Sequence, residues 1–239
     1  FPANKITINL APADLPKEGG RYDLAIALGI LAAAEEIPET LLEQHEFIGE
    51  LALSGELRPV RGVLSGAIQT QNSKRILIIP SDNAEEASLC QGAEQKSAES
   101  LLQVCAYLRG QAHLENIDNL EQPECLEEHA NLSEVRGQAQ AKRALEITAA
   151  GKHNLIFIGP PGTGKTMLAS RLPGILPPMN ETEALESAAI HSISTQQTQW
   201  LKRWRQRPFR NPHHTASGIS LVGGGCKPKP GEISLAHCG

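Results

Sequence analysis

The chain has 239 residues, 40% of them hydrophobic, and a net charge of −5, which suits one large domain or two modest ones. No apolar run approaches the roughly 18–20 residues that a membrane-spanning helix needs, and the N-terminus shows no signal-peptide pattern. The five cysteines are an odd number without CxxC spacing, which argues against a disulfide framework or a zinc module and favours a reducing cytoplasm.

Charge is divided unevenly along the chain. Residues 1–130 hold 9 Lys/Arg and 21 Asp/Glu, a balance of −12, whereas residues 131–239 hold 13 and 6, a balance of +7. This split indicates two domains with different partners. The basic half suits nucleic acid, and equally a nucleotide site surrounded by solvated charge.

Periodicity in the first half predicts a mixed α+β domain over residues 1–110. Strands are expected where short apolar runs alternate or are bounded by turn residues, and helices where apolar residues recur at helical spacing. The predicted strands are 6–10, 47–53, 57–60 and 76–79, with a turn at Ser54-Gly55, and the predicted helices are 23–36, 62–71, 83–89 and 97–109. The polar, acidic stretch 111–132 is expected to be a linker.

The second domain is expected over residues 133–239. A helix over 138–150 precedes stop signals at Gly151 and Asn154. The apolar run 155–158 predicts a buried strand, and residues 166–172 predict a helix that ends before Pro173. The chain begins with Phe1 rather than Met and stops within an apparently structured region, so we expect a fragment cut at both ends.

A complete GxxxxGK[ST] pattern lies between this strand and this helix, where a phosphate-binding P-loop belongs. The glycines allow backbone N–H groups to turn inward toward phosphates, and the following helix N-terminus adds positive potential. Lys165 is expected to reach the β- and γ-phosphates of ATP, and the Thr166 hydroxyl to be a Mg²⁺ ligand. The predicted nucleotide-binding residues are Gly159, Pro160, Pro161, Gly162, Thr163, Gly164, Lys165, Thr166 and Met167.

The carboxylate that ATP hydrolysis also needs is not found in this chain. After the P-loop the acidic residues are Glu181, Glu183, Glu186 and Glu232, and none follows an apolar strand. We therefore expect the Walker B strand beyond Gly239 and little or no hydrolysis by this fragment.

Three stretches of the chain carry a family resemblance. The first is Asn9–Lys17, the second is the P-loop with its lead-in from Glu134 through Gln138 and from His153, and the third is Arg207–Ser217 followed by Leu221–Gly225 and Pro230–His237. Together they resemble the magnesium-chelatase-like ComM/YifB family of AAA+ ATPases. The resemblance covers nearly the whole chain. It implies an α+β Lon-protease-like domain followed by an α/β P-loop NTPase domain that is incomplete at its C-terminus.

Further expectations rest on that resemblance alone. Gln138 falls where family members line the adenine pocket, and a helix-2 insert hairpin around residues 221–230 would face the pore of a hexameric ring. Family members of the ComM type are DNA-stimulated motors that promote branch migration in natural transformation.

The resemblance to Lon does not extend to its proteolytic dyad. Aligning residues 16–19 with the PKDG pattern places Arg21 where the nucleophilic Ser should be, and aligning residues 57–62 with the second motif places Leu64 where the Lys should be. Neither side chain can perform Ser–Lys chemistry. The first domain is expected to have the protease fold without the activity.

Several other side chains remain open to two interpretations. His213 and His214 could bind a metal, but neighbours in an extended segment point opposite ways, which favours a structural or pore-loop role. The run 202–210 mixes cations and aromatics as in nucleic-acid contacts, yet it also suits a solvated face anchored by one Trp. Lys227 and Lys229 are the better DNA candidates, and Cys226 and Cys238 are interpreted as bystanders.

The sequence therefore predicts a cytoplasmic AAA+ motor that uses ATP and Mg²⁺, forms a ring and acts on DNA. The alternative is a chelatase-like ATPase that remodels a protein or metal-insertion complex without DNA. An ATP-dependent protease is the least favoured interpretation.

Overall fold

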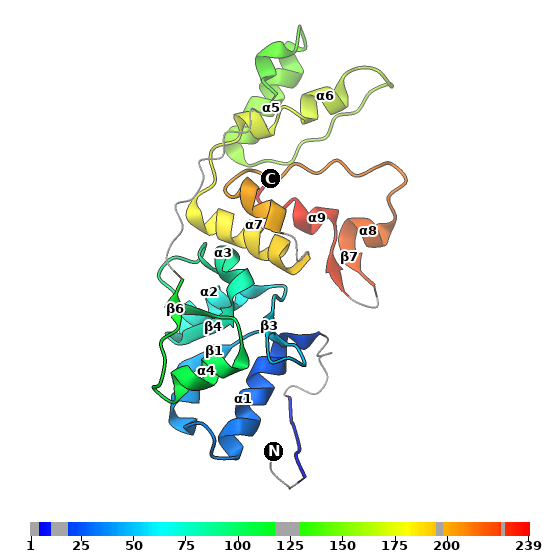
Figure 1. The fold of residues 1–239 in the computed structure, drawn as a ribbon. Helices are drawn as coiled ribbons and strands as arrows, with labels where there is room; N and C mark the ends of the chain where they lie inside the picture. The colour runs from blue at the N-terminus through cyan, green and yellow to red at the C-terminus, as the bar shows by residue number, and fades with distance from the viewer. Residues whose placement is uncertain (1–4, 11–18, 118–129, 195–197, 226–227) are drawn as a thin grey trace. The chain divides into compact units, whose positions relative to one another are not determined.

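The computed structural model describes residues 5–10, 19–117, 130–194, 198–225 and 228–239 (Figure 1). The chain divides into two compact units. The first contains residues 1–122 together with 192–198, and the second contains residues 123–191 and 199–239. Each is described by itself.

The first unit is built on a four-stranded sheet in the order β1-β4-β5-β6. Its strands are β1 (His45–Phe47), β4 (Ile76–Pro80), β5 (Gln95–Ala98) and β6 (Glu115–Asn116). The first three are parallel and β6 is antiparallel to β5. Strand β4 is central, and Leu77, Ile78 and Ile79 are all fully buried, as expected for a parallel strand covered on both faces.

Helices cover both faces of this sheet (Figure 1). Helices α1 (Asp23–Ala33) and α4 (Leu101–Leu108) bury Leu24, Leu28 and Val104 in one core with Ile78. Because side chains alternate along a strand, Leu77 and Ile79 face the other side, where α2 (Val63–Ser73) and α3 (Ala84–Ala87) lie. The short 3₁₀ helices of the chain are Gly20–Tyr22, Glu39–Gln44, Ser81–Asn83, Leu132–Glu134, Pro173–Ile175 and Thr198–Arg203.

The predicted strand 47–53 is divided in two by Gly49. Strand β1 ends at Phe47, and the chain then bends into the hairpin of β2 (Glu50–Leu51) and β3 (Leu57–Arg58). A Cβ at Gly49 would lie only 3.3 Å from Pro80 Cγ, so this close approach to β4 favours glycine. The predicted turn and return strand are confirmed.

Two other predictions for the first unit are wrong. Residues 6–10 pair with no described strand, and Ile6 and Ile8 remain 40% and 52% exposed. The predicted helix 97–109 begins only at Leu101, because Gln95–Ala98 is strand β5. The helices predicted over 23–36 and 62–71 are confirmed as α1 and α2.

The second unit is mainly helical in its described part. Its helices are α5 (Ala139–Gly151), α6 (Lys165–Ala169), α7 (Glu181–Ser194), α8 (Gly218–Val222) and α9 (Glu232–Leu235), and the last three residues of α7 fall within the first unit. Its strands are β7 (Gly223–Gly224) and β8 (Lys229–Pro230), which form an antiparallel hairpin. Helix α5 confirms the predicted helix 138–150, and Leu132, Val135, Leu145 and Leu168 form a small core.

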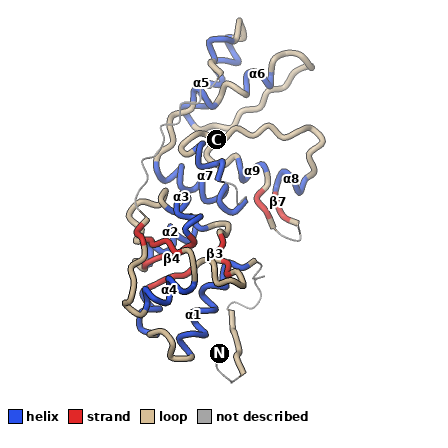
Figure 2. Tube along the Cα trace, viewed as in Figure 1, coloured by secondary structure: helices blue, strands red, loops and turns tan. Residues whose placement is uncertain are grey.

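The buried strand predicted over residues 155–158 is not formed. Figure 2 shows loop between α5 and α6, and Ile156 and Ile158 are 78% and 89% exposed. The chain is thus mixed α/β with a parallel sheet, but the described parallel strands all lie in the first unit. Among the described residues, no helix has the length and apolar character needed to cross a lipid bilayer.

Candidate P-loop nucleotide site

The loop from Gly159 to Gly164 has the backbone conformation that the glycine spacing predicts. Gly162 and Gly164 have φ values of 80° and 82°, in the left-handed region that disfavours residues with a Cβ. A Cβ at Gly162 would touch nothing within 4 Å, so conformation rather than crowding requires glycine there. Helix α6 then starts at Lys165, with Gly164 as its N-cap.

Lys165 lies across the loop that precedes it. Its Nζ donates hydrogen bonds to the carbonyl oxygens of Gly159 at 2.8 Å and Pro160 at 2.7 Å. Thr163 Oγ1 also donates to the Pro160 oxygen at 3.0 Å. The ammonium group is therefore held beside the loop backbone, where it can exchange carbonyl oxygens for phosphate oxygens.

Gln138 is joined to the loop although 25 residues separate it from Thr163. Its Nε2 donates to the Thr163 carbonyl oxygen at 3.2 Å. Gln138 has a φ of 56° as the N-cap of α5, an uncommon conformation for a residue with a side chain. The structure thus places Gln138 beside the P-loop, while its predicted contact with adenine stays a prediction.

Apolar packing and one ion pair support the loop from behind. Leu168 of α6 is buried with Leu145 of α5, and Phe157 packs against this cluster. Arg171 NH2 lies 3.0 Å from Glu134 Oε2 and ties the end of the α6 segment to residues 132–134. Sequence reasoning missed Arg171, because an ion pair across 37 residues leaves no local pattern.

Thr166 and Met167 occupy the first turn of α6 and are exposed. The helix ends at Ala169 rather than at the predicted Leu172, and tighter turns continue the chain to Leu172. A helix of five residues contributes only a small dipole, so phosphate binding here depends chiefly on the loop N–H groups and Lys165.

Two acidic side chains after the P-loop are engaged elsewhere in the second unit. Glu183 lies 2.5 Å from Lys152 Nζ and 2.9 Å from Arg207 NH2, and the hydrogen bond from Lys152 lowers the pKa of its carboxyl group. The two carboxylate oxygens of Glu232 accept hydrogen bonds from Arg210, one from Nε at 2.6 Å and one from NH2 at 2.7 Å. This bidentate pairing lowers the pKa of the Glu232 carboxyl group. This pairing argues that neither Glu183 nor Glu232 is the carboxylate that would hold Mg²⁺ during ATP hydrolysis.

The hairpin predicted around residues 221–230 is present as β7 and β8. Lys229 is exposed at the start of β8, while Lys227 falls outside the described residues. Of the two lysines predicted to contact DNA, the structure therefore describes only Lys229, which is exposed on strand β8.

The basic run 202–210 fits the interpretation of a solvated face anchored by one Trp better than that of a nucleic-acid contact. Trp204 is 5% exposed, which makes it the anchoring side chain of a buried face. Arg207 is turned to the carbonyl oxygens of Pro177 and Cys238 and to Glu183. These contacts give the run a structural role.

The argument that His213 and His214 point opposite ways is wrong. Their ring centroids lie 4.1 Å apart, because the chain turns at this point instead of remaining extended. His213 Nδ1 is already paired with Thr215 Oγ1 at 2.7 Å. Within the described residues no third Cys, His, Asp or Glu joins the two rings in a ligand group.

In the first unit, the two positions aligned with the Lon dyad lie in neighbouring segments. Arg21 NH1 is 3.8 Å from the place where a Cβ of Gly62 would stand, at the N-cap of α2. Leu64, in the first turn of α2, is fully buried.

Comparisons with known proteins agree with this geometry. A family model described as magnesium chelatase, subunit ChlI, matches residues 131–239, and one described as subunit ChlI of Mg-chelatase matches residues 1–83. The whole chain is 56% identical to the uncharacterized protein YifB of Salmonella typhimurium and 55% identical to YifB of Escherichia coli, covering 47% of each. It is 52% identical to the competence protein ComM of Haemophilus influenzae, covering 48% of that protein. The chain thus spans about half the length of these relatives. The two ChlI models and the 52–56% identity over the whole chain support a ComM/YifB-like protein of the magnesium-chelatase family.

Proposed function

We propose that this chain carries the phosphate-binding part of an AAA+ ATPase site and belongs to a ring-forming, DNA-stimulated motor. The observation that carries the proposal is Lys165, bonded to the Gly159 and Pro160 carbonyl oxygens above a loop with two left-handed glycines. The match to the ChlI family and the identity with ComM support it.

The residues of the loop fit ATP with Mg²⁺. Backbone N–H groups between Gly159 and Lys165 would surround the phosphates, and Lys165 Nζ would leave its two carbonyl partners to pair with phosphate oxygens. The exposed Thr166 hydroxyl would hold Mg²⁺, which neutralises phosphate charge when bound. Gln138 would border the base, beside the loop that its side chain already contacts.

ATP binding tests this half of the proposal directly. The chain should bind a fluorescent ATP analogue weakly in the presence of Mg²⁺, and Lys165→Ala should reduce the affinity by on the order of 100-fold, since one charge-assisted contact is worth about 1.5–3 kcal/mol. Lys229→Ala removes an exposed lysine of the same unit and should leave the affinity unchanged. Equal binding by the wild type and Lys165→Ala would sink the assignment.

We further expect little or no ATP turnover by these 239 residues. Glu183 and Glu232 are ion-paired, and no acidic residue after the P-loop ends an apolar strand. Steady hydrolysis by the purified chain that disappears in Lys165→Ala would show that the catalytic carboxylate is present after all.

A DNA-binding measurement distinguishes the DNA-stimulated motor from the alternative, a chelatase-like ATPase that remodels a protein or metal-insertion complex. The match to the ChlI family favours this alternative. If Lys227 and Lys229 of the hairpin contact phosphates, the Lys227→Ala/Lys229→Ala variant should bind duplex DNA less tightly, with a salt slope smaller by about 0.9 per lost contact. Lys165→Ala should keep the wild-type slope. In the longer protein, absence of ATPase stimulation by DNA at low salt would favour the remodelling alternative.

We propose that the first unit is a Lon-like domain without proteolytic activity, acting in the cytoplasm. Support comes from Arg21 and the fully buried Leu64, which occupy the positions aligned with the nucleophile and the base. Within the described residues, Cys90, Cys105 and Cys238 form no disulfide, which suits a reducing compartment. Cleavage of casein by the longer protein would revive the protease interpretation.

A further inference from the structure

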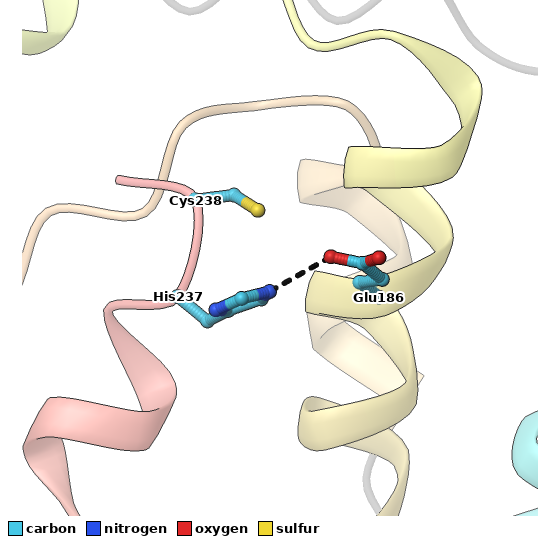
Figure 3. A group of neighbouring side chains, drawn as sticks. All are labelled: Glu186, His237 and Cys238. Carbon is cyan, nitrogen blue, oxygen red and sulfur yellow. Dashed lines mark hydrogen bonds and ion pairs between the residues drawn. The ribbon is translucent and has the colours of Figure 1, made fainter. Parts of the chain in front are cut away.

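Three metal-ligand side chains meet in the second unit, and none of them belongs to the P-loop. Glu186 comes from the middle of α7, whereas His237 and Cys238 follow the end of α9 (Figure 3). One carboxylate oxygen, one imidazole nitrogen and the thiol sulfur all lie within 4.8 Å of one another. Figure 3 shows the His237 ring and the Cys238 sulfur both directed toward the Glu186 carboxylate.

The backbone that presents His237 and Cys238 is held in an unusual conformation. Cys238 has a φ of 63°, which residues with a Cβ rarely adopt. Its carbonyl oxygen accepts a 2.7 Å hydrogen bond from Arg207, and the same guanidinium is paired with Glu183. Neighbouring turns, closed by the His237 N–H on the Ser234 oxygen and the Gly239 N–H on the Ala236 oxygen, further fix the segment.

Two of the three side chains are already paired with each other and reachable from solvent. His237 Nε2 is 3.0 Å from Glu186 Oε2, so imidazole and carboxylate are already oriented toward the same point. The side chains of Glu186 and His237 are about half exposed, which leaves a route for an ion from solvent.

We propose that Glu186, His237 and Cys238 form a Zn²⁺ site that links α7 to the segment after α9. Nitrogen, sulfur and carboxylate oxygen are the ligand types that Zn²⁺ takes, at about 2.0–2.3 Å, and three protein ligands leave a fourth position for water. Ligand atoms already within 4.8 Å need only small side-chain rotations to reach a common ion. Cys238 is then a ligand rather than a bystander, and the site does not depend on ATP binding at the P-loop.

The test is metal titration of the chelator-treated 239-residue chain. We expect one Zn²⁺ per chain by elemental analysis, and Co²⁺ substitution should give the absorption of a thiolate-bound tetrahedral ion. Cys238→Ser, His237→Ala and Glu186→Gln should each weaken Zn²⁺ binding by on the order of 10–100-fold or more, since even outer contacts of metal ligands are worth this much. Bound Zn²⁺ should raise the melting temperature of the wild-type second unit, and this gain should vanish in the variants.

Matched controls guard against binding elsewhere and against misfolding. The His213→Ala/His214→Ala variant removes two imidazoles that lie beside each other outside the proposed site. Cys226→Ser removes a thiol that is not a proposed ligand. Both variants should therefore bind Zn²⁺ as the wild type does. Cys238→His replaces one ligand by another and should restore binding that Cys238→Ser loses, which shows that the fold persists. No saturable binding, binding unchanged in Cys238→Ser and His237→Ala, or loss of binding in either control would overturn the site.

Discussion

Glu86 is a buried carboxyl group that caps a helix from outside. Gly62, the N-cap of α2, has no side chain with which to accept a hydrogen bond, and Glu86 Oε1 accepts the Leu64 N–H at 3.0 Å instead. Glu86 is only 5% exposed, and Ser192 Oγ donates to the same oxygen. Burial raises the pKa of Glu86, although these hydrogen bonds partly counter the effect.

The raised pKa predicts a pH dependence for the first unit. A carboxyl group that holds its proton more tightly when folded contributes stability fully below its ordinary pKa of 4.5, and this contribution is lost as pH rises through the folded pKa. Glu86→Gln keeps an acceptor oxygen for Leu64 but cannot ionise. Its unfolding free energy relative to the wild type should therefore rise with pH above 4.5, as measured by denaturant unfolding across that range.

Glu86→Ala provides the contrasting variant. It leaves the Leu64 N–H and the Ser192 hydroxyl without their acceptor, so the first unit should lose about 1–3 kcal/mol below pH 4.5. This deficit should shrink as pH rises, because alanine cannot ionise either. A Gln variant that behaved like the Ala variant would show that the negative charge, rather than the oxygen, stabilises α2.

At the scale of elements, the loop from Leu155 to Ile158 has an inside and an outside. Phe157 packs against the core of Leu145 and Leu168, whereas Ile156 and Ile158 are 78% and 89% exposed. This alternation is that of a strand with one bare face, and such apolar surface promotes self-association. Ile156→Ser/Ile158→Ser should reduce self-association in light scattering while changing stability by no more than about 0.5 kcal/mol.

Phe157→Ala is the matched variant on the inner face. It removes a partly buried aromatic ring and should lower the stability of the second unit by about 2–3 kcal/mol, toward the low end for such truncations. Equal stability losses in the outer and inner variants would contradict the alternation.

Elements with helical periodicity were predictable, and polar strands were not. Helices α1, α2 and α5 agree with their apolar spacing, and the P-loop could be placed because all its residues are local in sequence. Strand β5 was missed because Gln95 is buried in it, its amide nitrogen donating to the Ala87 and Cys90 carbonyl oxygens. The Ser-x-x-Gln pattern at Ser100 could have marked where α4 begins, since Ser100 caps Gln103 N.

The candidate sites show the same division between local and distant information. Gly162, Gly164 and Lys165 were identified from spacing alone. The pairing of Arg171 with Glu134, and of His237 with Glu186, depends on how distant segments pack, which a single sequence does not reveal. His213 and His214 were misjudged because their extended backbone was assumed.

At the scale of the whole molecule, the two units differ in charge and in architecture. The first combines a parallel sheet with an acidic composition, and the second places a P-loop in a largely helical, basic segment. The second unit includes residues 123–191 and 199–239, while residues 192–198 belong with the first. The linear boundaries 1–110 and 133–239 stay a prediction, because a single cut cannot describe this interleaving.

Separate cores predict separate responses to ligand. Leu132, Val135, Leu145 and Leu168 support the P-loop and take no part in the sheet core around Ile78.

A ligand that binds only the folded state adds about 2.7 kcal/mol of stability at 100 times its dissociation constant. MgATP should therefore raise the melting temperature of the second unit while leaving that of the first unchanged, as resolved by hydrogen exchange of peptides from each unit during heating. Lys165→Ala should abolish the shift without changing the melt in the absence of nucleotide, since within the described residues the hydrogen bonds of Lys165 Nζ all go to the loop itself. Equal protection of sheet peptides and P-loop peptides would instead show that the two cores unfold as one cooperative body.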